Sequence, residues 1–227
     1  MKKWKNKYLA GFGLAAVAAG LAGGITISYL SDEETKINTI SFSELEISLK
    51  EPDWDALPDG DGDGIPDSGV GILPGSAVLK NPIVAHEKGA DAYVYLQVNV
   101  PRRKVRLVSA DGKTFTGPED TDLFGYQTED GWELIREKTG PETHSCLYAY
   151  TAAVLKEGEF SSPLFKNIYY ADVLEGELPG KEIQEIRVQA FAIQSEYLNG
   201  PEGTVKEQME TAYQEFLNQS GFEEVSG

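Results

Sequence analysis

The stretch Ala92-Tyr93-Val94-Tyr95-Leu96-Gln97-Val98-Asn99-Val100 decides the fold class of this chain. Aliphatic side chains occupy every second position of it, and tyrosine or amide side chains occupy the positions between. Because successive side chains of a β-strand point to opposite faces of a sheet, this alternation predicts a strand with one fully aliphatic face. Pro101 follows directly and is expected to end the strand.

Further strand patterns lie on both sides of this stretch. Residues 185–194 alternate in the same way, with Ile186, Val188, Ala190 and Ala192 on one face and Arg187, Gln189, Phe191 and Ile193 on the other. Shorter β-rich runs are expected at residues 40–49, 77–85, 105–109, 132–136, 147–154 and 164–173. Many short strands without intervening helices predict an all-β fold, an antiparallel jelly-roll-like β-sandwich over residues 29–200.

One helix is expected after the strands, over residues 201–221. Thr204 and Glu207 have the spacing of a capping box, and Gly221 can end the helix. Apolar residues recur between them at helical spacing: Val205, Met209, Ala212, Tyr213, Phe216 and Leu217. This pattern predicts a C-terminal amphipathic helix packed on the sandwich.

The N-terminus has the pattern of an export signal. Residues 1–7 contain four lysines, and residues 8–27 are uncharged and rich in alanine and glycine. A basic segment followed by an apolar one is typical of a secretory signal peptide. Small residues at Thr26 and Ser28 favour cleavage between Ser28 and Tyr29. The alternative is an uncleaved membrane anchor, since the run is just long enough to span a bilayer.

Length and charge restrict the partners. The 227 residues suffice for one good core. The formal net charge is −17, and removal of residues 1–28 would remove lysines but no acidic residue. This charge opposes nucleic acid and anionic lipid as partners, so the membrane is expected to matter only during export. The composition suits a protein outside the cell, or one that collects divalent cations.

Few residues are candidates for catalysis. His86 and His144 are the only histidines, and Cys146 is the only cysteine. His86-Glu87 lacks the second histidine of a zinc-protease helix. His144 and Cys146 are expected on one face of a strand, but the sequence shows no third group to orient them. We therefore interpret Cys146 as a small apolar strand residue and expect no enzyme activity.

An aspartate–glycine run within the acidic loop at residues 53–71 predicts a calcium site. Calcium prefers six to eight oxygen ligands, which alternating carboxylates in a tight loop can supply. Positions 1, 3, 5, 7 and 9 of an EF-hand-type loop fall on Asp59, Asp61, Asp63, the Ile65 carbonyl and Asp67. Val70 replaces the usual acid at position 12, and Asp53 or Asp55 could substitute for it. The alternative is a solvated acidic loop without a metal.

A short basic cluster interrupts this acidic chain. Arg102-Arg103-Lys104 and Arg106 follow the long apolar strand. Charged residues beside such a strand commonly protect a sheet edge against unwanted pairing. We expect that role for them rather than a binding patch.

Several segments spread along the chain carry a family resemblance: Gly23-Gly24-Ile25-Thr26-Ile27-Ser28 with Tyr29-Leu30-Ser31-Asp32, residues 45–55, Leu73-Pro74-Gly75, Lys80-Asn81-Pro82, Ala92-Tyr93-Val94, Leu164-Phe165 and Gln189-Ala190-Phe191-Ala192-Ile193-Gln194. Together they resemble the TasA and camelysin family of secreted Gram-positive proteins. The first of these segments is similar to substrates of the dedicated signal peptidase SipW. The aspartate–glycine run is not a hallmark of the family.

The resemblance implies a jelly-roll subunit that assembles with itself into fibres of the extracellular matrix or cell surface. It also implies that the mature N-terminus acts as a donor strand for the next subunit. Here that segment is residues 29–39. The apolar residues expected to act in the donor strand are Leu30 and Ile37 within it and Ile40 directly after it. The alternatives are a camelysin-like secreted metallo-endopeptidase, for which no zinc-ligand set is recognisable, and a monomeric calcium-stabilised binding module.

Overall fold

The computed structural model describes residues 45–60, 62, 66–67, 72–178, 185–195 and 203–220, with side chains of the last helix to Leu217. Within these residues the chain is mostly β-strand, and every strand pairing is antiparallel. The expected leader at residues 1–28 lies outside this range. No helix of the described part is long and apolar enough to cross a membrane.

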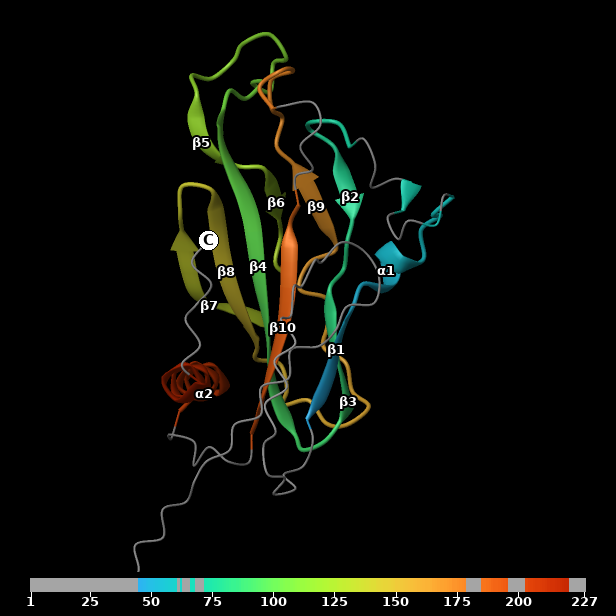
Figure 1. The fold of residues 1–227 in the computed structure, drawn as a ribbon, viewed down its shortest axis with the longest axis vertical. Coiled ribbons are helices and arrows are strands. Elements are labelled where there is room, and N and C mark those ends of the chain that lie inside the picture. Colours follow the sequence, from blue (N-terminus) through green and yellow to red (C-terminus); the bar gives the residue numbers. More distant parts are fainter. Residues whose placement is uncertain are drawn as a thin grey trace, which may run out of the picture.

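The described residues form three sheets (Figure 1). The largest contains β10 (Arg187–Gln194), β4 (Ala92–Val105), β8 (Thr143–Tyr150) and β7 (Trp132–Thr139) in that order, and β5 (Glu119–Asp122) pairs with the end of β4. The second contains β2 (Ala77–Leu79), β9 (Asn167–Tyr170) and β6 (Phe124–Tyr126). The third pairs β1 (Glu46–Lys50) with β3 (Ile83–Lys88).

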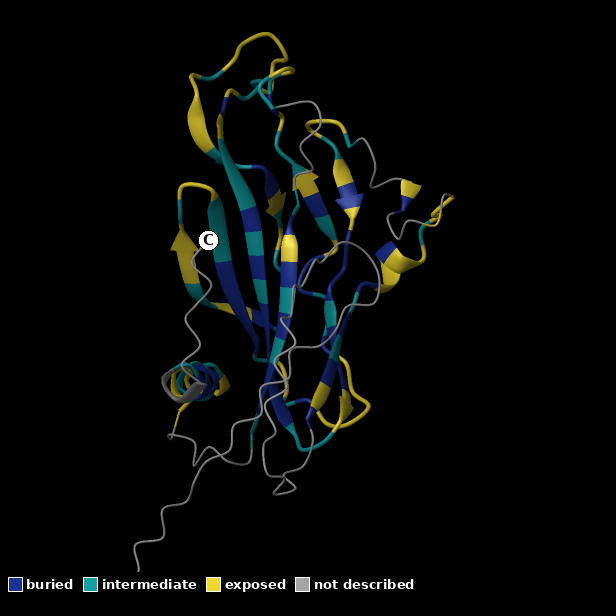
Figure 2. Ribbon diagram, viewed as in Figure 1, coloured by how far each residue is buried: buried dark blue, intermediate teal, exposed yellow. Residues whose placement is uncertain are grey.

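The predicted alternation in β4 is confirmed, and both of its faces are buried. Val94, Leu96 and Val98 belong to the main core, to which strands of all three sheets contribute. Tyr93 and Tyr95 point to the opposite face and belong to a second apolar cluster. Burial on both faces makes β4 the central strand of the fold (Figure 2).

Helix α2 (Val205–Ser220) covers the second face of the largest sheet. Met209, Ala212 and Tyr213 are buried against Tyr95 and its neighbours, and the Tyr95 hydroxyl donates a hydrogen bond of 2.9 Å to the Met209 carbonyl. The capping box is present, since the Thr204 amide donates to Glu207 and the Glu207 amide donates to the Thr204 hydroxyl. Gly221 lies outside the described residues.

Pro101 does not end β4, contrary to expectation. The Pro101 carbonyl accepts a hydrogen bond of 2.9 Å from the Leu123 amide. The N–H and C=O of a strand residue point to the same side, so an N–H at position 101 would point toward Leu123 and away from β8. Its absence in proline therefore removes no hydrogen bond to β8. Pairing with β10 also stops earlier, at Asn99. The strand therefore continues to Val105.

Other strand boundaries also differ from those expected. The expected run at residues 77–85 is two strands in different sheets, because the chain leaves the strand conformation at Lys80-Asn81-Pro82. The expected run at residues 105–109 is not a separate strand, because β4 ends at Val105 and only isolated bridges follow at residues 107–108. The remaining expected runs form strands with shifted ends: β1, β7, β8, β9 and β10. The acidic region opens with a short helix, α1 (Pro52–Asp55), where a loop was expected.

The edge-protecting role expected for the basic cluster is wrong for its first three residues. Arg102, Arg103 and Lys104 lie inside β4 and pair with β5, opposite Asp122, Thr121 and Asp120 respectively. Opposite charges directly across an antiparallel pair attract one another, so the cluster stabilises a pairing instead of preventing one.

Candidate functional site

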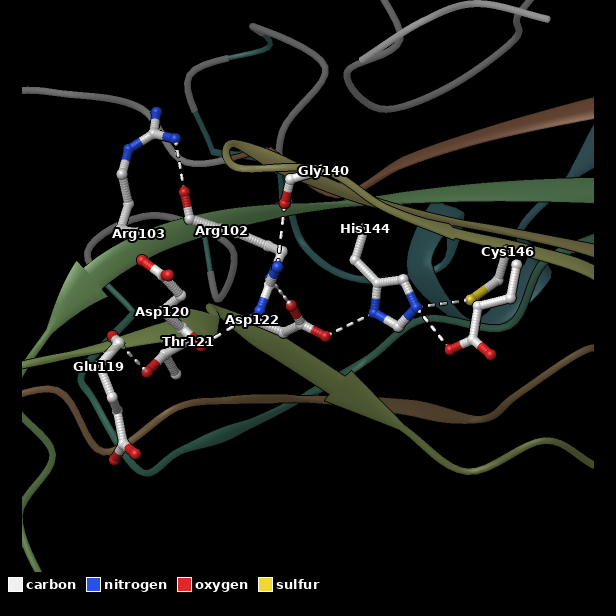
Figure 3. A network of polar contacts seen from close by, with 10 residues as sticks. Arg102, Arg103, Glu119, Asp120, Thr121, Asp122, Gly140, His144 and Cys146 are labelled. Atoms are coloured by element: carbon white, nitrogen blue, oxygen red, sulfur yellow. Dashed lines mark hydrogen bonds and ion pairs between the residues drawn. The ribbon is translucent and has the colours of Figure 1, made fainter.

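A group of polar and ionisable side chains lies where β5, β7 and β8 come together. His144 and Cys146 are two residues apart on β8, so their side chains point to the same face. Glu137 is opposite Cys146 on β7, and Asp122 is the last residue of β5. We call Asp122, Glu137, His144 and Cys146 the β8 cluster (Figure 3).

A β-bulge places Glu137 in this cluster. The register of β7 against β8 shifts by one residue between Leu134 and Arg136. Without the shift, Arg136 would lie opposite Cys146, and a one-residue slip would exchange the faces of the following side chains. The bulge therefore puts a carboxylate beside the histidine instead of a guanidinium.

His144 is at the centre of the cluster. Its Nδ1 lies 2.6 Å from Asp122 Oδ2, and its Nε2 lies 2.8 Å from Glu137 Oε1 and 3.4 Å from Cys146 Sγ. Figure 3 shows the imidazole between Asp122 and Cys146. The structure thus supplies the orienting group that is not evident from the sequence, because Asp122 comes from a strand 22 residues earlier.

Arg102 holds Asp122 in place. Its Nε lies 2.7 Å from Asp122 Oδ1, while its two terminal nitrogens donate to the carbonyls of Gly140 and Asp120 at 2.9 and 3.2 Å. The guanidinium therefore ties the β7–β8 turn to β5. Since one Asp122 oxygen forms an ion pair with Arg102 and the other contacts His144, the orientation of this carboxylate is restricted.

The electrostatic environment favours the protonated, positively charged form of His144. Partial burial lowers the pKa of His144, but hydrogen bonds and charge attraction from Asp122 and Glu137 outweigh it and raise the pKa above its ordinary value. Burial raises the pKa of the Cys146 thiol, against hydrogen bonds from the hydroxyls of Tyr126 and Tyr148. A thiol with a raised pKa is a poor nucleophile, so the pair does not have the electrostatics of a catalytic Cys–His site.

A cavity of about 270 Å³ lies on the opposite face of the same β7–β8 hairpin, the face that α2 covers. Lys138, Ser145 and Tyr213 line it, and Glu137 also borders it, but His144 and Cys146 do not. His86, the second histidine, lies elsewhere in β3, where its ring is buried and neither nitrogen has a hydrogen-bond partner among the described residues.

The aspartate–glycine run is described only in part. The Asp59 carboxylate accepts a hydrogen bond of 2.8 Å from the Gly62 amide, and the Asp67 carboxylate accepts one of 3.1 Å from the Gly60 amide. The second of these contacts brings the two ends of the run together. Asp61, Asp63 and Ile65 lie outside the described residues, as do Ser28, Tyr29, Leu30, Ile37 and Ile40.

Calcium binding to this loop stays a prediction. Carboxylates crowded within one loop repel each other unless a cation neutralises them, so calcium is expected to raise the melting temperature by binding the folded chain. The rise should grow with the logarithm of calcium concentration, as scanning calorimetry can measure. The double variant Asp61→Ala, Asp63→Ala should lose this response while keeping the melting temperature of the calcium-free protein. An unchanged calcium response in the variant would show that the loop is only solvated.

Comparison with protein-family models, curated proteins and solved structures finds no match to this chain.

Proposed function

We propose that this chain is a secreted structural subunit of extracellular fibres, with a jelly-roll topology and without catalytic activity of its own. A signal peptidase of the SipW type would release it before Tyr29, at the surface of a Gram-positive bacterium. Residues 29–39 of one copy would then add as a strand to the next copy. This proposal rests on the sequence resemblance together with the arrangement of β1.

The observation that carries the proposal is the position of β1. Among the described strands, β1 pairs with β3 alone, yet it lies against β10 of the largest sheet without pairing to it (Figure 1). Its buried side chains, Ile47 and Leu49, already belong to the main core. An extended segment that added to β1 would extend the sheet by backbone hydrogen bonds, which is the mode of strand-addition complexes.

The geometry of such a contact produces a filament. The donor segment precedes β1 in the chain, whereas the acceptor belongs to the next copy, so donor and acceptor surfaces differ. A head-to-tail contact between different surfaces does not close on itself unless its rotation happens to form a ring. Repeated addition therefore builds a linear polymer.

Assembly is expected to depend on pH and salt. Copies with a formal net charge of −17 or below repel each other at neutral pH. Protonation of carboxylates reduces this repulsion, and salt screens it beyond a Debye length of about 8 Å at physiological ionic strength. Electron microscopy of the concentrated protein beginning at Tyr29 should show more fibres in mild acid or at high salt. Fibres that form best at neutral pH and low salt would contradict this role of charge.

The alternative functions make different predictions. A camelysin-like peptidase would cleave casein, and a chelator would abolish the cleavage. A monomeric calcium-stabilised module would gain thermal stability from calcium and remain monomeric under every condition that favours fibres.

A further inference from the structure

Three atoms of the β8 cluster converge on one point. Glu137 Oε1, His144 Nε2 and Cys146 Sγ all lie within 4.8 Å of one another. His144 Nε2 lies 2.8 Å from the glutamate oxygen and 3.4 Å from the sulfur. An oxygen, a nitrogen and a sulfur in this arrangement are a ligand combination that zinc accepts.

The spacing is near that of a tetrahedral metal site. Zinc bond lengths imply separations of about 3.4 Å between nitrogen and oxygen ligands and about 3.6 Å between nitrogen and sulfur ligands. The Sγ–Nε2 distance of 3.4 Å is already close to this value. The Glu137 oxygen, 2.8 Å from Nε2, would have to withdraw by about 0.6 Å on the same reckoning, and its side chain is 53% exposed and able to do so.

The surroundings of the three ligands are those of a metal site. Zinc-bound histidines usually donate their second ring N–H to a carboxylate, which fixes the tautomer and ring orientation. Asp122 is in that position, 2.6 Å from Nδ1, and is itself held by Arg102. On the other side, the hydroxyls of Tyr126 and Tyr148, which lie 3.1 Å from each other, are next to Cys146, where a hydroxyl donor would stabilise a thiolate.

The site is buried on the Cys146 side and accessible to solvent on the Glu137 side. Cys146 is buried and the His144 side chain is 19% exposed, whereas Glu137 reaches solvent. A cation can therefore enter past Glu137, and water can complete a fourth coordination position. Asp122 and Glu137 place two carboxylates around the imidazole, and this anionic environment attracts a divalent cation.

We propose that Glu137, His144 and Cys146 bind one zinc ion or a similar thiophilic divalent metal, with Asp122 as the positioning residue. The metal would join β7 to β8 and, through Asp122, to β5. A thiolate and an imidazole favour zinc over calcium or magnesium, which prefer oxygen ligands. The site is therefore separate from the aspartate–glycine loop in both position and metal preference. It does not depend on the proposed fibre function.

Cobalt(II) titration of the protein beginning at Tyr29 tests the proposal, with excess calcium present to occupy the aspartate loop. Cobalt replaces zinc in such sites and reports its ligands through visible and near-ultraviolet absorption. We expect one cobalt per chain, a thiolate-to-cobalt charge-transfer band, and displacement by zinc. Cys146→Ala should abolish that band, and His144→Gln should abolish tight binding.

Two further variants and one control variant keep the test decisive if those replacements disturb the core. Glu137→Gln changes a solvent-exposed ligand and should weaken zinc binding, whereas Glu133→Gln on the same strand should leave it unchanged. Asp122→Asn should weaken zinc affinity by about 10–100-fold while keeping the charge-transfer band, as expected of a positioning residue. Absence of cobalt binding, a spectrum without the thiolate band, or equal affinity in the Glu137 and Glu133 variants would overturn the proposal.

Discussion

Replacement of Lys80 by alanine is expected to lower the free energy of unfolding by about 3–5 kcal/mol, because it leaves a buried carboxylate without its counter-charge. Lys80 Nζ lies 2.5 Å from Glu51 Oε2, and the two side chains are only 10% and 6% exposed. The ammonium also lies 4.7 Å from the centre of the Trp54 ring. The pair thus joins the end of β1 and helix α1 to the segment after β2.

The effect should depend on pH. Desolvation raises the pKa of Glu51, and attraction to Lys80 opposes that rise. Without Lys80 the pKa of Glu51 in the folded state should rise further above its unfolded value. A group with a raised folded pKa contributes stability below its unfolded pKa and loses it as pH increases through the folded pKa. Urea unfolding of Lys80→Ala should therefore show a larger loss at neutral pH than in mild acid.

Two controls accompany this variant. The double variant Glu51→Leu, Lys80→Met removes both charges and should recover most of the stability, since a buried ion pair can often be replaced by apolar side chains. Lys50→Ala disrupts a solvent-exposed pair with Glu87, whose side chains are 41% and 40% exposed, and should have a much smaller effect. Equal losses in Lys80→Ala and Lys50→Ala would show that burial of the first pair does not control its contribution.

The sequence predicts the centre of the fold well because the pattern there is strong. β4 and β10 alternate over many residues, and the helix carries both a capping box and an apolar stripe. β5 has the sequence Glu119-Asp120-Thr121-Asp122 and could not be predicted, since it has no apolar face. It is a strand because its acids face the basic residues of β4 across the sheet.

The β8 cluster could be predicted only in part. Spacing places His144 and Cys146 on one face, and their contact confirms it. Glu137 joins them only because a bulge shifts the register of β7, and Asp122 joins them only through the β4–β5 pairing. Neither local propensity nor spacing contains these long-range relations, which depend on tertiary pairing.

Loss of residues 29–39 is expected to abolish fibre formation without unfolding the subunit. The segment is too polar to require burial in its own core, but Ile37-Asn38-Thr39 at its end, with Ile40 directly after it, can extend as a strand. If its backbone pairs with β1 of a neighbouring copy, its removal deletes the donor and leaves the core of β1, β4 and β10 complete. A free peptide of residues 29–39 should also block elongation, because it would occupy the acceptor, whereas a scrambled peptide should not.

A matched pair of substitutions separates strand addition from a general effect of charge. Ile37→Asp introduces an acid at an apolar position of the donor, and Asn38→Asp introduces the same charge at the adjacent polar position. Ile37→Asp should suppress fibres strongly, while Asn38→Asp should slow assembly only slightly. Equal effects of the two would assign assembly to net charge alone.

The most direct measurement compares the protein beginning at Tyr29 with the protein beginning at Ile40, by electron microscopy, sedimentation and circular dichroism under the same mild-acid, high-salt conditions. The account predicts fibres for the longer form, and a monomer with an unchanged β-sheet spectrum for the shorter form. Fibres formed by the shorter protein, or none formed by the longer one at any pH or salt concentration, would contradict it.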